Sequence, residues 1–163
     1  MRRWLLEPHV RRWWDDGVHL PYPDAVIDSY RDAIRGEDPT YHYMALIDGL
    51  SAGMFQHYRI RDDPEYAQAL ALGEDAIGVD LFIGEPELIG HGHGPKMLGA
   101  FLRKVAMPFH GLDVCVIGPS VSNVAAIRAY EKTGFVSLRT ALVPGEPEPE
   151  QLMRITRGDL APE

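Results

Sequence analysis

The chain of 163 residues is long enough for one domain with a sizeable hydrophobic core, and its 45% hydrophobic and 25% charged residues are ordinary for a globular protein. Its formal net charge of −8 argues against a nucleic-acid partner, which needs a basic face, and no apolar run approaches the roughly 20 residues that cross a membrane. The single cysteine, Cys115, excludes an internal disulfide and predicts a cytoplasmic protein.

Two helices are predicted at the start of the chain. Residues 4–14 have a helical apolar pattern that Pro8 interrupts, since a proline inside a helix removes a backbone hydrogen bond. Residues 15–23 are predicted to form a loop, and Asp24 is a suitable N-cap for a second helix that ends near Arg35. The expected buried face of this second helix carries Val26, Ile27, Tyr30 and Ile34.

A β-hairpin follows these helices. Asp48-Gly49 is a strong turn signal between predicted strands at residues 41–47 and 51–60. Residues 61–75 are polar and acidic with short apolar stretches, which predicts a long, partly helical excursion of the kind that often carries function.

The second half of the chain alternates strands with helices. One helix is predicted at residues 95–106, and a last helix runs from an N-cap at Ser122 to about Lys132, with Gly134 as the residue that ends it. The predicted strands lie at residues 77–83, 112–117, 135–143 and 151–157. This order predicts a single α/β domain over residues 1–163, with a mixed sheet.

A glycine-rich turn precedes the helix at residues 95–106. Gly90, Gly92 and Gly94 let the backbone approach a ligand closely, and the free N–H groups of the first helical turn favour an anion. Pro95 is tolerated in a first turn, and Lys96 adds a positive charge. The pattern fits neither a P-loop nor a Rossmann fingerprint, and the alternative is a plain tight turn.

Longer stretches around this turn resemble a known family. They are Gly-Val-Asp-Leu-Phe-Ile-Gly at residues 78–84, the glycine-rich turn, Pro-Ser-Val-Ser-Asn at 119–123, and Ala-Ile-Arg-Ala-Tyr-Glu-Lys-Thr-Gly-Phe at 126–135. Together they resemble the acetyl-CoA-binding half of the GNAT superfamily of N-acetyltransferases. Within it, the Trp13-Trp14 pair and the long acidic excursion are most similar to the aminoglycoside 6′-N-acetyltransferases.

The resemblance implies a mixed, mostly antiparallel sheet flanked by helices, with acetyl-CoA between two strands that splay apart. The pantetheine arm would bond to the main chain of Leu81, Phe82 and Ile83. Asn123 would contact the same arm, although an asparagine there is equally suited to starting a helix. The pyrophosphate would lie on the turn formed by His91, Gly92, His93, Gly94, Pro95 and Lys96.

Two residues are implied to be catalytic. Asp80 interrupts an apolar strand and would be the base that takes a proton from the acceptor ammonium. Tyr130 would protonate the departing thiolate. The alternatives are an Asp80 that caps or salt-bridges at the strand end, and a Tyr130 that only packs.

The acceptor is expected to be a small cationic amine. Trp13, Trp14 and Tyr66 are candidates for an apolar wall against sugar rings, although one tryptophan is as well suited to the core. Nearby carboxylates would attract ammonium groups, or belong to a solvated loop. These carboxylates are Asp62, Asp63, Glu65, Glu74 and Asp75.

The sequence departs from the family in three places. Ile89 stands where many members have Gln or Arg, and Gly118 stands where well-studied aminoglycoside enzymes have an aspartate immediately before Pro-Ser-x-x-Asn. The usual first strand is expected to be missing, because the chain begins inside the usual first helix.

The expected function is transfer of an acetyl group from acetyl-CoA to a primary amine, with the 6′-amino group of an aminoglycoside as the first candidate. The alternatives are a siderophore-type lysine N-acyltransferase, a protein N-terminal acetyltransferase and a non-catalytic acyl-CoA-binding protein. We expect a monomer or homodimer without nucleic-acid or membrane partners. No metal site is expected, since no histidine or cysteine spacing fits one.

Overall fold

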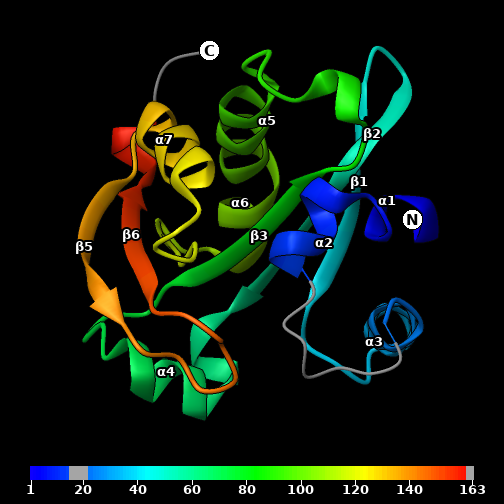
Figure 1. The fold of residues 1–163 in the computed structure, drawn as a ribbon. Coiled ribbons are helices and arrows are strands. Elements are labelled where there is room, and N and C mark those ends of the chain that lie inside the picture. Colours follow the sequence, from blue (N-terminus) through cyan, green and yellow to red (C-terminus); the bar gives the residue numbers. More distant parts are fainter. Residues whose placement is uncertain (15–21, 161–163) are drawn as a thin grey trace.

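The computed structural model describes residues 1–14 and 22–160, which build a twisted six-stranded sheet with helices on both faces (Figure 1). The strand order is β1-β2-β3-β4-β6-β5, in which β3 and β4 are parallel and the other neighbours antiparallel. The strands are β1 (Tyr41–Ile47), β2 (Leu50–Arg59), β3 (Ile77–Ile83), β4 (Val114–Ile117), β5 (Val136–Ala141) and β6 (Glu150–Thr156). The predicted mixed, mostly antiparallel sheet is therefore confirmed.

The hairpin and the strand that carries Asp80 lie where the sequence predicts them. Asp48 and Gly49 both have positive φ, 49° and 78°, as a two-residue hairpin turn requires. The excursion after β2 is partly helical, with a short 3₁₀ turn and α4 (Pro64–Leu70).

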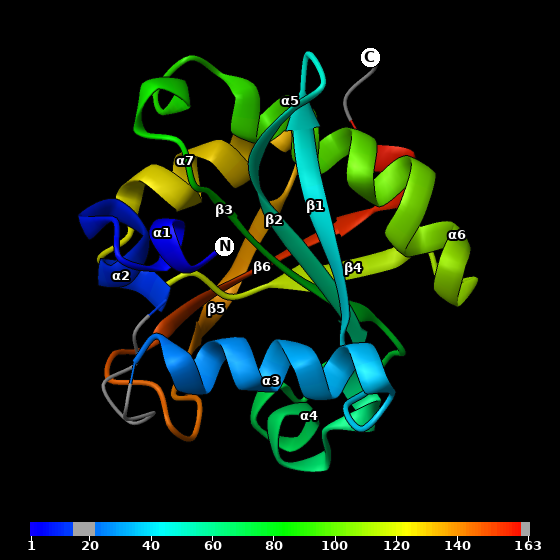
Figure 2. The same ribbon diagram turned by 90° about the vertical axis from the view of Figure 1, so that its right-hand side faces the viewer.

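The helices divide between the two faces of the sheet (Figure 2). On one face, α5 (His93–Phe101), its continuation through α6 (Met107–His110), and α7 (Val124–Thr133) cover the largest core cluster. On the other face, α1 (Arg2–Leu5), α2 (Pro8–Trp14) and α3 (Asp24–Arg35) pack on Met54 and Phe82, and α4 packs near Val116. Throughout residues 1–14 and 22–160, every helix is too short or too polar to span a bilayer.

The first helices differ from the prediction in detail. Pro8 begins α2, so the break before it separates α1 from α2 as expected from the proline. The cap of α3 is Pro23, and Asp24 is its first helical residue, so the predicted N-cap is wrong by one position. Ile34 is 80% exposed, because α3 contacts the core through its first two turns only. Most of the predicted loop at 15–23 lies outside the described residues.

The helix after the glycine-rich turn is longer than predicted. It begins at His93, two residues early, and continues through a π-helical segment, Leu102–Ala106, into α6. Pro108 is the second residue of α6, where its missing N–H removes one helical hydrogen bond.

The last helix begins one residue later than the sequence suggests. Asn123, and not Ser122, is its N-cap, since the Asn123 side chain accepts a 3.1 Å hydrogen bond from the amide of Ala126. Gly134 ends the helix with a φ of 112°, as predicted.

Two central strands splay apart. β3 and β4 pair only at Ile77 with Cys115 and Gly78 with Val116. Beyond Gly78, β3 stays paired with β2 and leaves β4, so the residues from Asp80 to Ile83 border an opening in the sheet. This separation confirms the predicted splay.

Candidate active site

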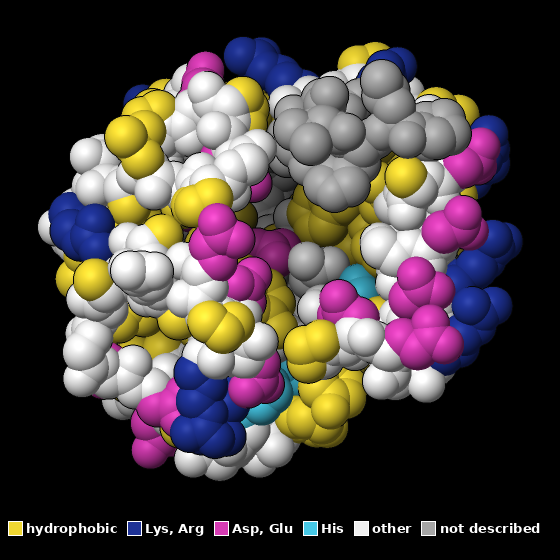
Figure 3. Space-filling model, turned by 90° about the horizontal axis from the view of Figure 1, so that it is seen from below, with side chains coloured by type: hydrophobic (Ala, Val, Ile, Leu, Met, Phe, Trp, Pro, Cys, Tyr) yellow, Lys and Arg dark blue, Asp and Glu magenta, His cyan; other side chains and the backbone are white. Residues whose placement is uncertain are grey.

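A cavity of about 940 Å³ opens beside β2 and β3, on the face of the sheet from which the side chains of Gln56, Tyr58 and Asp80 project. Strand β3, α2, α4, the loop 118–123 and the turn 144–149 all contribute to its walls. In Figure 3, acidic side chains gather around the hollow on this face. Of the described residues that line the cavity, two are basic, Arg12 and Arg59, and eight are acidic. The acidic ones are Asp38, Asp62, Asp63, Glu65, Asp80, Glu146, Glu148 and Glu150.

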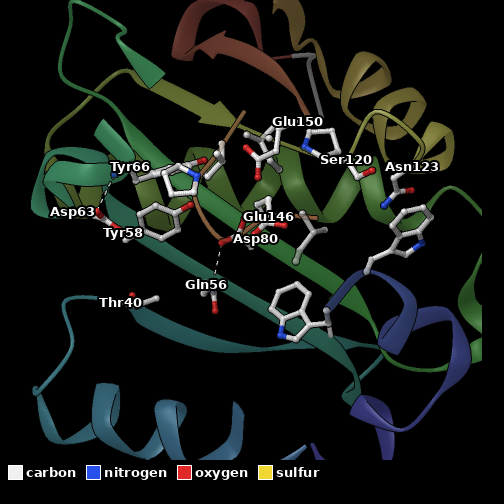
Figure 4. Close-up of a pocket in the computed structure, with 18 of the residues that line it drawn as sticks. Thr40, Gln56, Tyr58, Asp63, Tyr66, Asp80, Ser120, Asn123, Glu146 and Glu150 are labelled. Carbon is white, nitrogen blue, oxygen red and sulfur yellow. Dashed lines mark hydrogen bonds between the residues drawn. The ribbon is translucent and has the colours of Figure 1, made fainter. Parts of the chain in front are cut away.

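Asp80 lies at the centre of this cavity (Figure 4). Its register partner on β2 is Gln56, whose side-chain amide donates a 2.8 Å hydrogen bond to Asp80 Oδ2. Burial raises the pKa of Asp80, while hydrogen bonds from Gln56 and Tyr58 partly oppose the shift. A carboxylate of raised pKa, held in place by a neutral partner, is suited to accept a proton from a bound ammonium group.

Glu150 brings a second carboxyl group into the same cavity, and sequence reasoning missed it. It is the first residue of β6, and Figure 4 shows it across the cavity from Asp80. Burial first, then the charges of Glu146 and Asp80, raise the pKa of Glu150 to about 8. Gln56 and Tyr58 were also missed, although the alternation of side chains along a hairpin strand places them on the Asp80 face.

Tyr130 also lines the cavity, from α7. It is 9% exposed and its ring lies 5.9 Å from that of Phe135, so it also belongs to the core. Burial raises the pKa of Tyr130, which keeps its hydroxyl protonated and able to donate.

The two tryptophans have different surroundings. Trp13 is 38% exposed at the cavity wall, with the guanidinium of Arg12 4.6 Å above its ring. Trp14 donates a 2.8 Å hydrogen bond to the Tyr30 hydroxyl and packs edge-on against Phe82, with ring centroids 4.9 Å apart. Trp14 is therefore the more structural of the pair, although both border the cavity.

Only part of the acidic excursion reaches the cavity. Tyr66, Asp62, Asp63 and Glu65 line it, and Asp63 also caps α4 through a 3.0 Å bond from the Tyr66 amide. The other two candidates lie elsewhere. Glu74 pairs with Arg154 at 2.7 Å, and Asp75 pairs with Arg59 and Arg61; neither carboxylate lines the cavity.

The opening between β3 and β4 is where the pantetheine was expected. Leu81 lines the cavity, and Phe82 is buried among the N-terminal helices. The carbonyl of Ile83 already has a partner, His9, whose Nε2 lies 3.0 Å away. The main chain of this segment therefore borders the gap, with one of its acceptors engaged.

The glycine-rich turn has the geometry of an anion site. Gly90 and Gly92 have φ values of 80° and 77°, and Gly92 is the N-cap of α5. The first helical residues are His93, Gly94 and Pro95, so the proline still falls in the turn whose N–H groups lack intrahelical partners. His91 and Lys96 are exposed beside it. Open space surrounds Gly92, and the contact nearest to a Cβ at Gly94 would be Ile83 at 4.0 Å.

Three other candidates remain: Asn123, Cys115 and a metal site. Asn123 caps α7, one of its two predicted roles, and it also borders the cavity. Cys115 is fully buried, and burial raises the pKa of its thiol, so it is poorly suited to act as a nucleophile. In the described part of the chain, no group of three or more His, Cys, Asp or Glu side chains is arranged to hold a metal ion.

Comparisons with known proteins agree with this geometry. The profile of the GNAT acetyltransferase domain matches residues 1–142. The aminoglycoside N(6′)-acetyltransferase type 1 of Klebsiella pneumoniae is 27% identical over 146 residues, which cover 88% of this chain and 71% of that protein. The enzyme of the same name from Serratia marcescens has the same identity and coverage.

Solved structures give the same picture. The crystal structure of the aminoglycoside acetyltransferase AAC(6′)-Ib with coenzyme A matches with a TM-score of 0.80 and 26% identity, over 97% of this chain and 88% of that one. A structure of the same enzyme with coenzyme A and kanamycin matches with the same score, identity and coverage.

Proposed function

Since this chain belongs to the GNAT family and is an acyl-CoA-dependent N-acetyltransferase, we propose that its acceptor is the 6′-amino group of an aminoglycoside. The observation that carries the proposal is the acidic cavity beside the splayed strands. Its described lining residues include eight carboxyl side chains and only two guanidinium groups. Such a site favours a substrate with several ammonium groups.

In the proposed reaction, Asp80 acts first. An ammonium group must lose a proton before its nitrogen can attack a thioester, and Asp80 is the carboxylate at the point where β3 leaves β4. The amine nitrogen then forms a bond to the acetyl carbon while the carbon–sulfur bond breaks. Tyr130, kept protonated by burial, gives its proton to the departing thiolate and takes up the proton that the acylated nitrogen loses as the amide forms.

The donor is proposed to be acetyl-CoA. The backbone of Leu81 to Ile83 borders the gap in which the pantetheine arm would lie, and the first turn of α5 offers free N–H groups to the pyrophosphate. Lys96 adds charge at the same turn, and Asn123 lines the cavity beside the gap's other strand, β4, at the end of the loop 118–123. A coenzyme A donor also agrees with the cytoplasmic location predicted from the sequence.

The acceptor side favours a sugar. Trp13 presents an exposed ring at the cavity wall, and Tyr66 contributes a second ring from α4. Flat apolar rings beside carboxylates suit a molecule with C–H faces and ammonium groups. A lysine acyltransferase of siderophore assembly, which tends to have histidine at the position of Asp80, fits these residues less well.

A thiol-release assay with acetyl-CoA tests the proposal. Purified protein should acetylate kanamycin and ribostamycin, and mass spectrometry of the product should show one added acetyl group. The matched control is an aminoglycoside with a hydroxyl in place of the 6′-amine, which should release thiol only at the background rate. Equal release with the control, or none with any aminoglycoside, would refute the proposed acceptor.

A further inference from the structure

Glu150 occupies the space that a side chain at position 118 would need. The chain after β4 runs beside the start of β6, where the amide of Gln151 donates a 2.8 Å hydrogen bond to the carbonyl of Pro119. A Cβ added at Gly118 would lie 2.7 Å from Cδ of Glu150, and closer still to its Oε2. Glycine at position 118 is therefore what admits the Glu150 carboxyl group into the cavity.

The Glu150 carboxyl group has unused hydrogen-bonding capacity. Its Oε2 is buried and has no hydrogen-bond partner among the described residues, in contrast to Asp80, which Gln56 holds. A buried carboxyl oxygen without a partner is costly unless something binds to it. Neither proton transfer of the proposed reaction involves Glu150.

We propose that Glu150 binds a second ammonium group of the acceptor, so that the enzyme selects polyamino over monoamino substrates. The inference rests on the proposed function, since it extends the same cavity to a second contact. The acid comes from β6 into the place left by Gly118, opposite Asp80, so the two carboxyl groups can hold two amines of one molecule.

Binding at Glu150 should release a proton. Its surroundings are Asp80 on β3, Tyr58 on β2, Tyr66 on α4 and Glu146 on the turn before β6. None of these is a cation, and burial beside these acids favours the protonated form of Glu150 at pH 7. An arriving ammonium group lowers the pKa of Glu150, which then ionises and loses its proton.

Steady-state kinetics with two acceptors measure the selection. Kanamycin carries several amines, and 6-amino-6-deoxyglucose carries one on a similar sugar ring. Glu150→Gln should raise the KM for kanamycin by roughly 10- to 150-fold, the loss of one charge-assisted contact. The KM of the monoamine should change far less. The ratio of the monoamine KM to the kanamycin KM should therefore fall by nearly the same factor.

Two further variants separate binding from packing. Gly118→Ala keeps the carboxyl group but displaces it, and should reduce the same KM ratio. The double variant Gly118→Asp with Glu150→Ala returns a carboxylate from position 118, and should restore most of the selectivity if the acid itself is what matters. A double variant that folds but remains unselective would overturn the proposal.

Calorimetry separates this inference from the proposed function. Kanamycin binding to wild type at pH 7, measured in two buffers of different ionisation enthalpy, should show release of about one proton that Glu150→Gln abolishes. If kanamycin is acetylated but Glu150→Gln changes neither proton release nor selectivity, the inference fails alone. If kanamycin binds with Glu150-dependent proton release but is not acetylated, only the proposed function fails. If neither kanamycin nor spermidine binds, both fail.

Discussion

The side-chain amide of Gln56 donates a 2.8 Å hydrogen bond to Oδ2 of Asp80 across the β2–β3 pair, where the two residues are register partners. This bond stabilises the ionised form of Asp80 against the burial that favours its neutral form. Gln56 therefore helps to set the pH at which Asp80 can accept a proton.

Gln56→Met should move the acidic limb of the pH–rate profile. The replacement has a similar length but no donor, so the pKa of Asp80 rises further and the carboxylate forms only at higher pH. The limb of log kcat/KM on the acid side should shift upward in pH, while the plateau rate changes little. An unchanged limb would mean that Asp80 is not the group that titrates.

Asp80→Asn should remove the base while keeping a side chain of nearly the same size and shape. We expect kcat to fall by about 10²- to 10⁴-fold at neutral pH, because an amide cannot accept the ammonium proton. The affinity for coenzyme A, measured by calorimetry, should stay nearly constant. Asp28→Asn, on the exposed face of α3, is the control and should keep the wild-type rate. A near-normal rate in Asp80→Asn would assign the base elsewhere.

Gly92→Val should weaken coenzyme A binding. Gly92 has a φ of 77°, which costs a side-chain-bearing residue about 1–2 kcal/mol, and the added side chain would stand over the first turn of α5. Gly73 has a φ of 72° and equally open surroundings, so Gly73→Val is a matched control for the backbone strain. Both variants should lose similar stability by denaturant unfolding, and only Gly92→Val should lose affinity. Equal affinities in the two folded variants would contradict the phosphate-turn assignment.

Tyr130→Phe should lower kcat while leaving coenzyme A affinity nearly intact, since only the hydroxyl is lost. We expect a loss of about tenfold or more, because a positioned acid contributes 10²–10⁴ and water replaces part of it. Tyr43→Phe removes another partly buried hydroxyl, outside the cavity, and should keep its kcat. If both variants turn over like wild type, Tyr130 is a packing residue.

The elements that sequence patterns predicted well are those with local causes. Asp48-Gly49 dictates its turn through positive φ, and the apolar run at residues 77–83 is recognisable as a strand from its own residues. The helix-start at Ser122 was wrong by one residue because Ser and Asn cap equally well and stand side by side. Ile34 fits the helical period, but periodicity does not say how far the core extends.

Of the two central carboxyl groups in the cavity, the sequence predicted Asp80 and missed Glu150. Asp80 interrupts an apolar strand, and a charged residue at such a position is itself a local signal of function. Glu150 stands at the end of a Pro- and Glu-rich turn, where an acid looks solvated. Only the placement of β6 beside the chain at Gly118 brings that acid into the cavity. Such a contact between distant segments leaves no local pattern.

The pH dependence of stability offers a test of Glu150 that needs no substrate. Its pKa is raised to about 8 in the folded protein, against 4.5 for an ordinary glutamate. Between these values the folded state holds a proton that the unfolded state has lost, so wild-type stability should fall as pH rises from about 4.5 to 8. The amide that Glu150→Gln introduces cannot ionise, so the variant should gain several degrees of melting temperature relative to wild type across this window.

Glu148→Gln is the matched control for this pH window, because the pKa of Glu148 is shifted in the opposite direction. Ser120 and Ser122 donate hydrogen bonds to Glu148 and lower its pKa, so its contribution is present above the unfolded pKa and is lost only in acid. Melting curves of wild type and both variants should be recorded by circular dichroism from pH 4 to 9. The difference between Glu150→Gln and wild type should grow up to about pH 8 and then level off. A difference that stays flat over this range would show that Glu150 titrates normally, because a solvated carboxyl group ionises alike in the folded and unfolded states.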